Sequence, residues 1–487
     1  MVNTAIVANV IGVLLVLLGS FMFTSLFFSL CYESGDAVAI VKASLTTILI
    51  GALIWVWTRN ASKKIGRKEG FLIVALGWLS VCAFGSLPYY LSGVTPEFTN
   101  AVFESVSGMT TTGATILKDI EVIPKGILFW RSLTQWLGGM GIIVLTVALF
   151  PLLGIGGVEL FVAEAPGPTS DKIHPRIKET AKRLWLIYVG ITIFLCPLLY
   201  FSGMSFYDAI NHALTTMATG GFSTKNTSIA HFDSPLIEYI IIFFMLLSSI
   251  NYSVIYFGLK GKLKKVWSSD ELKIYIFVVI FLIVVIGSSM HQISNIPLEE
   301  SFRMTAFQII SIITTTGFVT ADYTSWAPVF TFLFFALFFV GGCAGSTSGG
   351  IKIIRHLVLF KNSFLELERL LHPKALIRVK IDNKIVSPRI LTHILVFVIL
   401  YMLLFFVGSI TMAVILSDFE QPILSAMGAA ASSLGNIGPS IAELGPTNTF
   451  YDVPHTGKWV LIFLMILGRL ELFTILILLT PFYWKGN

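Results

Sequence analysis

The chain has very few charged residues for its length. Only 12% of its 487 residues are Asp, Glu, Lys or Arg, whereas 55% are hydrophobic. An ordinary soluble domain carries about 25% charged residues. This scarcity excludes a soluble globular protein and predicts a chain that folds within a membrane.

Cysteine and histidine are also scarce. The four Cys lie in or beside apolar segments without paired spacing, so neither a disulfide framework nor a zinc site is indicated. The eight His are scattered, mostly near loops or span ends, and are interpreted as surface or interface residues. Because the apolar segments hold no metal-ligand cluster or nucleophile–base pair, we expect neither an enzyme nor an organic cofactor.

Instead, the chain has repeated apolar runs of about 20 residues, the length that crosses a hydrocarbon core of about 30 Å. We predict ten membrane spans, which would place both termini on one side. No basic region or cleavage site marks the first run as a signal peptide, so we expect it to be retained. The predicted spans are Thr4–Phe28, Ala37–Trp57, Phe71–Leu91, Gly126–Leu153, Leu184–Phe201, Pro235–Leu259, Ile274–Met290, Pro328–Phe360, Ile390–Leu416 and Lys458–Trp484.

Most Lys and Arg fall on one side of these spans. They gather in Arg59–Gly70, Pro151–Arg183, Lys260–Lys273, Lys352–Arg389 and the C-terminal tail, whereas the opposite loops are acidic. Basic loops stay on the cytoplasmic side of a membrane, so this side and both termini are predicted to be cytoplasmic. The net charge of +6 therefore reflects orientation, and we expect no nucleic-acid partner.

Four Thr/Ser-rich tracts that contain glycine recur at a period of about 100 residues. Each follows a segment too short and too polar to cross the membrane, which is typical of a re-entrant helix. The short segments are Phe98–Met109, Phe206–Met217, Leu298–Ile313 and Gln421–Ser433. The tracts are Thr110–Thr115, Ala218–Ser223, Thr314–Val319 and Ser433–Gly438.

Irregular backbone at membrane depth survives only where protein covers it or where it lines a water-filled space. Carbonyl oxygens of four such tracts could replace the hydration shell of an ion, and glycine permits the backbone angles that turn carbonyls inward. A single Thr-Gly pair would be an ordinary turn, but four in register favour a filter. We therefore predict an all-α polytopic membrane protein. Four span–pore-helix–span units would surround a central ion pore with pseudo-fourfold symmetry, after two extra N-terminal spans.

The predicted organisation divides the chain into six segments. An N-terminal two-span extension covers residues 1–70, and pore unit 1 covers 71–153. Pore unit 2, with a preceding cytoplasmic loop, covers 154–260. Pore unit 3 with its intramembrane loop covers 261–360, a cytoplasmic linker covers 361–389, and pore unit 4 covers 390–487.

With these features, the chain resembles the bacterial potassium-uptake proteins of the Trk/Ktr/HKT superfamily, and most closely the TrkH subunit, over nearly its whole length. The resemblance implies one signature glycine per unit, at Gly113, Gly220, Gly317 and Gly435. Each tract lacks the full TVGYG of tetrameric potassium channels, so fewer or weaker ion sites are expected. The fourth tract departs most, with Leu434 where the others have Thr. The implied potassium-binding residues are Thr111, Thr112, Gly113, Ala218, Thr219, Gly220, Thr315, Thr316, Gly317, Leu434, Gly435 and Asn436.

A second glycine-rich tract, Gly341–Gly350, interrupts the predicted inner span of unit 3. Each Gly costs a helix about 1 kcal/mol relative to Ala, so the helix should break here. The tract could line the cavity under the filter, or it could pack helices closely through small residues. The resemblance favours an intramembrane gating loop, with Gly345, Ser346, Thr347, Ser348 and Gly349 as its gating residues.

Arg469 lies inside the last predicted span. A charge at the centre of a spanning helix costs about 2.5–3.5 kcal/mol, so Arg469 should face water or a partner. It could be an electrostatic barrier in the ion path or one member of a structural salt bridge. Glu471 would point away from it on a helix. The resemblance favours the barrier and a gating role.

The function predicted from these features is potassium uptake across the bacterial inner membrane, with potassium as the transported ion. The alternative is a secondary transporter that couples potassium to protons or sodium, for which acids such as Glu104 and Glu471 leave room. The resemblance also implies a homodimer and a soluble, cytoplasmic, nucleotide-binding regulatory subunit of the TrkA type. Membrane lipid is expected around the spans, and the basic segment Lys352–Arg389 could dock either the regulatory subunit or anionic headgroups.

Overall fold

The computed structural model describes residues 2–61, 66–152, 177–294 and 296–485. The predicted basic segments Arg59–Gly70 and Pro151–Arg183, and the boundary between units 1 and 2, lie partly outside these residues. The described chain is predominantly helical, as predicted. Its strands form one short antiparallel hairpin of β1 (Lys380–Ile381) and β2 (Lys384–Ile385).

Two long helices precede the four units. They are α1 (Thr4–Cys31) and α2 (Ala37–Trp57), and they pack closely through glycine. A Cβ added at Gly12 would lie 2.8 Å from the carbonyl oxygen of Gly51, so the two helices can approach this closely because glycine has no side chain. Between the two helices, the Asp36 carboxylate accepts a hydrogen bond of 2.8 Å from the Ile127 backbone and so ties the pair to unit 1.

The rest of the chain repeats an outer helix, a short helix and an inner helix. Unit 1 contains α3 (Arg67–Gly85), α4 (Leu87–Leu91), α5 (Phe98–Met109) and α6 (Lys125–Leu152). Unit 2 contains α8 (Ile177–Phe201), α9 (Phe206–Met217), η1 (Ser228–Phe232), α10 (Pro235–Ser248) and α11 (Tyr252–Leu259), and the short helix α12 (Leu263–Trp267) follows it. Unit 3 contains α13 (Asp270–Ser294), α14 (Leu298–Ile313), α15 (Pro328–Leu337) and α16 (Ile353–Leu371). Unit 4 contains α17 (Pro388–Ile415), α18 (Pro422–Gly435), η2 (Ala442–Leu444), α19 (His455–Arg469), α20 (Phe473–Leu476), η3 (Ile477–Leu479) and α21 (Pro481–Trp484).

Among the described residues, six helices are long and apolar enough to cross a membrane as single spans. Two further predicted spans are bent pairs, Pro235–Ser248 with Tyr252–Leu259 at 106° and His455–Arg469 with Phe473–Leu479 at 107°. The predicted inner span Pro328–Phe360 is broken at its glycine tract, as predicted. The helix ends at Leu337, and the chain is irregular until α16 begins, because the glycine tract cannot maintain helical hydrogen bonds cheaply.

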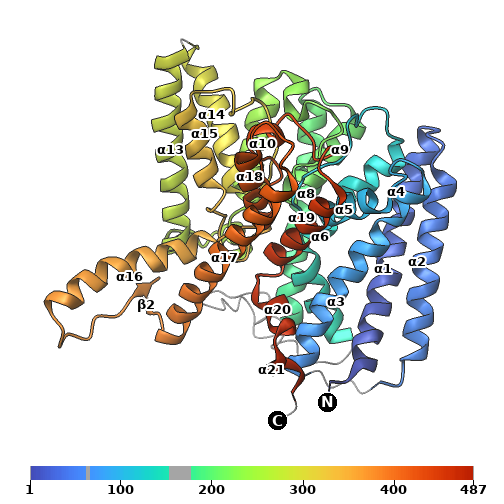
Figure 1. Cartoon of the computed structure of the whole chain (residues 1–487), viewed down its shortest axis with the longest axis horizontal. Helices are drawn as coiled ribbons and strands as arrows, with labels where there is room; N and C mark the ends of the chain where they lie inside the picture. Colours follow the sequence, from blue (N-terminus) through green and yellow to red (C-terminus); the bar gives the residue numbers. More distant parts are fainter. Residues whose placement is uncertain (1, 62–65, 153–176, 295, 486–487) are drawn as a thin grey trace.

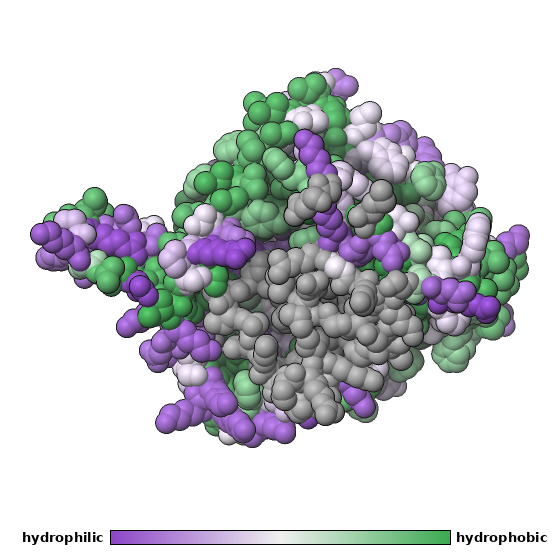
Figure 2. Space-filling model, turned by 90° about the horizontal axis from the view of Figure 1, so that it is seen from below, coloured by the Kyte–Doolittle hydropathy of each residue, from purple (hydrophilic) through white to green (hydrophobic). Residues whose placement is uncertain are grey.

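The elements divide between two ends of the molecule (Figure 1). The short helices α5, α9, α14 and α18 lie in the half away from the termini, and both termini lie together at the opposite end. Helix α16 and the hairpin project sideways from the bundle as an arm. Seen from the end that holds the termini, this arm carries many hydrophilic residues, whereas much of the bundle surface beside it is hydrophobic (Figure 2).

Candidate ion site at the four tracts

The four short helices end in the same way. In each, a backbone N–H two or three residues beyond the helix end donates to the carbonyl of a residue five positions earlier, and that residue has a hydroxyl side chain. This is a C-cap of the Schellman type. The bonds are Thr112–Ser107 at 2.9 Å, Gly220–Thr215 at 3.0 Å, Thr316–Ser311 at 2.8 Å and Ile437–Ser432 at 3.0 Å.

This shared bond aligns the tracts residue by residue. The residue before each donor is left-handed, with φ of +54° at Thr111, +52° at Thr219, +54° at Thr315 and +54° at Asn436. The residue after each donor is a left-handed glycine, with φ of +85° at Gly113, +77° at Gly221, +81° at Gly317 and +102° at Gly438. Left-handed backbone at these two positions prevents each tract from continuing its helix.

In two units the left-handed glycine is not the predicted signature glycine. Gly220 precedes the left-handed glycine, which is Gly221, and Gly435 is the last residue of α18, three positions before Gly438. Ala218 and Leu434 likewise lie at helix ends rather than in the extended segment. Asn436 could have indicated this alignment from the sequence, because Asn tolerates left-handed backbone. It is equivalent to Thr111 and lies two residues before the left-handed glycine.

The four left-handed glycines contact one another's tracts in a closed cycle. A Cβ on Gly113 would strike the carbonyl oxygen of Gly220, and one on Gly221 would strike that of Thr316. A Cβ on Gly317 would strike the oxygen of Ile437, and one on Gly438 would strike that of Thr112, which returns to the first tract. All four glycines also line a single cavity of about 150 Å³. The tracts thus converge on one place and leave no room there for side chains.

Side chains distinguish the tracts in alternate units. The Oγ1 atoms of Thr110 and Thr112 lie 2.7 Å apart, and those of Thr314 and Thr316 lie 2.7 Å apart. The equivalent residues are Ala and Gly in unit 2 and Gly and Ile in unit 4, so two tracts have hydroxyl pairs and two do not. In unit 4 the Asn436 amide donates to Thr112 Oγ1 at 3.0 Å and links the fourth tract to the first.

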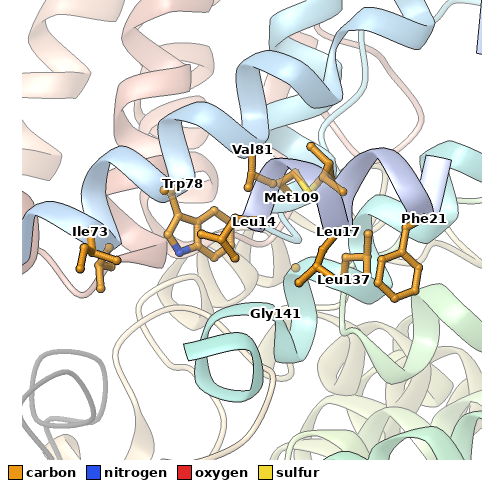
Figure 3. A pocket seen from close by; sticks show the side chains of 13 residues that line it. Leu14, Leu17, Phe21, Ile73, Trp78, Val81, Met109, Leu137 and Gly141 are labelled. Carbon is orange, nitrogen blue, oxygen red and sulfur yellow. The ribbon is translucent and has the colours of Figure 1, made fainter. Parts of the chain in front are cut away.

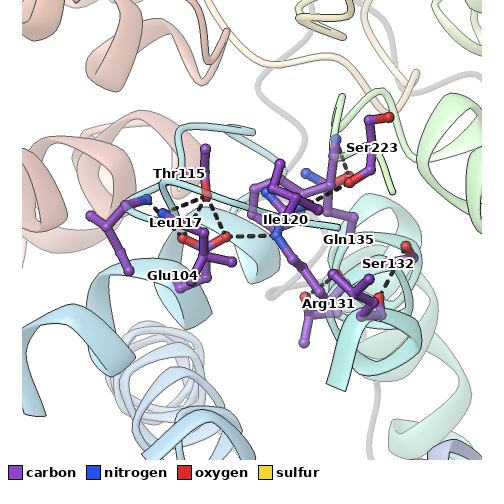
Figure 4. A network of polar contacts seen from close by, with 12 residues as sticks. Glu104, Thr115, Leu117, Ile120, Arg131, Ser132, Gln135 and Ser223 are labelled. Atoms are coloured by element: carbon purple, nitrogen blue, oxygen red, sulfur yellow. Dashed lines mark hydrogen bonds and ion pairs between the residues drawn. The ribbon is translucent and has the colours of Figure 1, made fainter. Parts of the chain in front are cut away.

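A buried ion pair supports the first two tracts (Figure 4). Glu104 on α5 and Arg131 on α6 are 2.6 Å apart, and their side chains are 0% and 2% exposed. Glu104 also accepts hydrogen bonds from Thr115 Oγ1 and the Ile116 N–H, whereas Arg131 donates to the Ser223 carbonyl at 2.9 Å. The pair therefore fixes the chain just beyond both glycines, and its charges are satisfied within the protein.

Position 104 has an equivalent in each unit, and three of the four side chains contact the chain that leaves the tract. In unit 2 the equivalent is His212, whose Nε2 lies 2.9 Å from Ser223 Oγ, and in unit 3 Gln308 donates to Thr320 Oγ1 at 3.2 Å. The fourth is Ala429, which has no such group. His212 is fully buried, so the interpretation of the histidines as surface or interface residues is wrong for this one.

Gln135 is a supporting residue that the sequence did not reveal. From α6 its amide donates to the Gly220 carbonyl at 2.6 Å, and its oxygen accepts from the Phe222 N–H at 3.0 Å. It therefore clamps the second tract across a unit boundary. A single Gln within an apolar helix gives no indication of which backbone it will meet.

The glycine-rich segment between α15 and α16 lies directly against the inner side of the tracts. The Gly349 N–H donates to Thr315 Oγ1 at 2.6 Å, and Thr347 Oγ1 donates to the Met217 carbonyl at 3.2 Å. Helix α13 also holds the segment, because Glu271 accepts a 2.7 Å hydrogen bond from the Ala344 N–H. These contacts place the predicted gating residues on the side of the tracts opposite the cavity.

Arg469 lies at the end of α19 and bridges this segment to unit 1. Its guanidinium donates to the Thr347 carbonyl at 2.9 Å and to the Gly138 carbonyl on α6 at 2.6 Å. Glu471 forms an ion pair with Arg355 on α16. Arg469 therefore binds backbone carbonyls from two units, at the level of the segment beneath the tracts.

The mouth of the cavity carries paired charges. Lys225 Nζ lies 3.8 Å from Glu121, and Asn226 joins the loops of units 1 and 2 by donating to Asp119 at 2.9 Å. This hydrogen bond lowers the pKa of the Asp119 carboxyl, so the loop keeps its negative charge. Apolar residues such as Leu117, Ile120 and Phe450 line the cavity beside these polar groups.

A second pocket, of about 70 Å³, lies between α1, α3 and α6 behind the end of α5 (Figure 3). Its labelled side chains, such as Leu14, Trp78 and Leu137, are predominantly apolar. Without oxygen ligands it cannot replace an ion's hydration shell. We therefore assign the candidate ion site to the tracts alone.

The buried pair gives a test of this support. Replacing Arg131 with Met leaves the Glu104 charge buried without compensation, and we expect a loss of about 3–5 kcal/mol in unfolding free energy. The double variant Glu104→Gln/Arg131→Met should be less destabilised than Arg131→Met. As a control, Lys118→Met removes an ion pair with Asp452 that is 58% and 73% exposed and should change stability little. Thermal melting in detergent that shows equal losses for Arg131→Met and Lys118→Met would contradict the proposed support.

Comparisons with known proteins agree with these features. The profile of the TrkH family, described as a cation transport protein, matches residues 36–485. The Trk system potassium uptake proteins TrkH of Salmonella typhimurium and of Escherichia coli K12 are each 40% identical to this chain, over 98% of it and 99% of their own length. The crystal structure of the potassium transporter TrkH from Vibrio parahaemolyticus superposes with a TM-score of 0.89 at 37% identity, covering 99% of this chain and all of that one.

Sequence, fold and relatives agree over essentially the whole length. The apolar helices and the bacterial relatives indicate a multi-pass protein of the bacterial inner membrane. The family is one of transport proteins rather than of catalysts. With its four converging tracts and its full-length match, this chain belongs to the TrkH family of cation transport proteins.

Proposed function

We propose that this protein takes up potassium through the space enclosed by the four tracts. The observation that carries the proposal is the closed cycle of contacts among Gly113, Gly221, Gly317 and Gly438, which line one cavity. Relatives that are 40% identical are named as potassium uptake proteins, which supports potassium as the ion.

The physical basis is the exchange of water for backbone oxygen. Four non-helical tracts that converge on one cavity could surround a dehydrated cation with carbonyl oxygens. The C-terminal ends of α5, α9, α14 and α18 meet the tracts, and each adds partial negative charge there. Hydroxyl pairs in two tracts only, and an amide on the Gly220 carbonyl, suggest fewer equivalent ion sites than a fourfold channel has.

The segment beneath the tracts and Arg469 are proposed to form the gate. Gly349 contacts the third tract directly, and Thr347 contacts the end of α9, where the second tract begins. Arg469 holds the Thr347 carbonyl and places a positive charge beside the path. In a low-dielectric cavity such a charge repels a cation much more strongly than in water. Opening would require the segment to move away from Thr315.

Several further features of the proposal follow from charge and from the family. The end that holds the termini and the basic segments is proposed to face the cytoplasm, so that the cavity opens outward. The relatives are named as parts of a Trk system, and we extend to this chain a soluble nucleotide-binding subunit of the TrkA type and a homodimer. The projecting α16 arm, with its basic surroundings, is a candidate docking surface for that subunit.

The alternative, a transporter that couples potassium to another ion, requires acids that titrate or bind the co-ion. The two acids that left this alternative open are engaged in structural pairs, Glu104 with Arg131 and Glu471 with Arg355. This favours passive flow through a gated path over obligatory coupling.

Flux into liposomes tests the proposal directly. Purified protein in potassium-loaded liposomes should pass rubidium down its gradient at a rate independent of any proton or sodium gradient. An ionophore that collapses the proton gradient serves as the control. Rubidium entry that stops without a sodium or proton gradient would establish the coupled alternative.

The backbone geometry of the fourth tract predicts different effects for its two glycines. Gly438→Ala places a methyl group on left-handed backbone, at a cost of about 1–2 kcal/mol, and against the first tract, so potassium selectivity over sodium should fall. Gly435→Ala changes the last residue of α18, which has ordinary helical backbone, and its methyl group meets first the flexible end of Ile437, so selectivity should remain near that of the parent. Ion-competition flux measured on both variants decides which of the two glycines determines selectivity. Loss of selectivity only in Gly435→Ala would restore the original assignment.

Removing the Arg469 charge should increase flux. Arg469→Ala takes away both the positive charge and the hydrogen bonds to Thr347 and Gly138, so unstimulated rubidium flux should rise while the preference for potassium persists. Arg469→Lys keeps the positive charge but loses the planar guanidinium group, so its rubidium flux should lie between that of the parent and that of Arg469→Ala. A variant with a lowered melting temperature and no gain in flux would show that Arg469 is only a structural residue.

A further inference from the structure

A deep apolar groove lies in unit 2, where the inner span bends. Helix α10 ends at Ser248, and α11 leaves it at 106° from Tyr252. The corner between these helices and α8 encloses about 690 Å³. The surrounding surface is apolar and exposed, with Phe194 at 60%, Phe243 at 59% and Leu259 at 71%. The groove therefore opens toward the hydrocarbon of the bilayer.

Glycine residues keep the groove open. A Cβ added at Gly190 on α8 would meet no atom within 4 Å, and one at Gly258 on α11 would meet only the Val266 side chain, at 3.8 Å. Along α8 the groove extends from Leu186 to Phe194, which is about 12 Å of helix and close to the roughly 15 Å depth of one hydrocarbon leaflet. Its length suits an extended acyl chain.

Basic residues gather at the end of the groove near α12. Lys260, Lys262, Lys264 and Lys265 are all exposed, and the sequence from Lys260 to Ser269 contains no acidic residue. Arg183 on α8 donates to the Tyr256 hydroxyl at 2.6 Å, which brings a fifth cation to the same end. Trp267 beside them is 60% exposed, as expected for a side chain at the membrane–water interface.

We propose that this groove binds an anionic phospholipid, with one acyl chain in the groove and its phosphate among these basic side chains. The chemistry of the groove fits this ligand, because the apolar wall can contact an acyl chain and the adjoining lysines can contact the phosphate of the same lipid. Another copy of this chain would have to supply an apolar segment ending in an acidic cluster. The binding itself does not depend on the proposed potassium path.

A lipid bound in the groove would also affect the glycine-rich segment beneath the tracts. The bend that forms the groove ends at Tyr252, whose N–H donates to the Gly345 carbonyl at 3.2 Å. A chain lying against Ile250 and Val254 would hold this corner in its present shape. This consequence for gating rests on the proposed function, whereas the lipid site does not.

Lipid titration of the full-length protein in detergent tests the site. Phosphatidylglycerol should bind, detected as an adduct in native mass spectrometry and as a raised melting temperature, and phosphatidylcholine with the same acyl chains should bind much more weakly. Gly190→Trp fills the groove and should abolish the difference between the two lipids. Lys260→Gln and Lys264→Gln should each weaken phosphatidylglycerol binding about fivefold at low salt.

Controls separate this site from general lipid contact. Val284→Trp on α13 alters an equally lipid-exposed position, 50% exposed, outside the groove and should bind phosphatidylglycerol like the parent. If Gly190→Trp fails to fold, the two lysine variants decide the question. Three results would each overturn the proposal. The parent could bind both lipids equally, both lysine variants could bind phosphatidylglycerol like the parent, or Gly190→Trp could lose a dimer rather than a bound lipid. Rubidium flux measured beside binding distinguishes failure of the lipid site from failure of the potassium pathway.

Discussion

The structure depends on the close approach of four backbone segments that leave no space for a Cβ. Each of Gly113, Gly221, Gly317 and Gly438 lies against a carbonyl of the next tract, and the contacts return to their starting point. Left-handed backbone at these residues and two positions earlier prevents each tract from continuing its helix. An extended segment of this kind cannot satisfy itself with regular hydrogen bonds, so the surrounding helices must hold it in place.

The helices provide that support by different chemical means in different units. An ion pair fixes the first tract, a buried histidine and an amide fix the second, another amide fixes the third, and Asn436 ties the fourth to the first and to the Met465 carbonyl. The repeats therefore share backbone geometry while their side chains have diverged. Among the described residues, the same asymmetry continues beneath the tracts, where unit 3 contributes the irregular segment and unit 4 contributes Arg469.

Periodicity and composition were sufficient to predict the helical membrane fold and the short helices. The predicted Phe98–Met109, Phe206–Met217 and Leu298–Ile313 are also the observed bounds of α5, α9 and α14. In units 2 and 4 the left-handed glycine is Gly221 or Gly438 rather than the predicted Gly220 or Gly435. Thr and Asn also adopt left-handed backbone there, so glycine content alone does not show which residue turns. The partners of Gln135, Arg469 and Glu471 lie in other units, more than 80 residues away in the chain, and no local pattern encodes such contacts.

The central claim is that the cation passes between the four tracts. Diffraction from crystals grown in rubidium or thallium, recorded at the absorption edge of the ion, tests this claim most directly. The account predicts anomalous density on the axis enclosed by Thr111–Gly113, Thr219–Gly221, Thr315–Gly317 and Asn436–Gly438. Replacing the ion with sodium should weaken this density. Density confined to another cavity, or an axis without density in crystals of transport-competent protein soaked in either ion, would contradict the account.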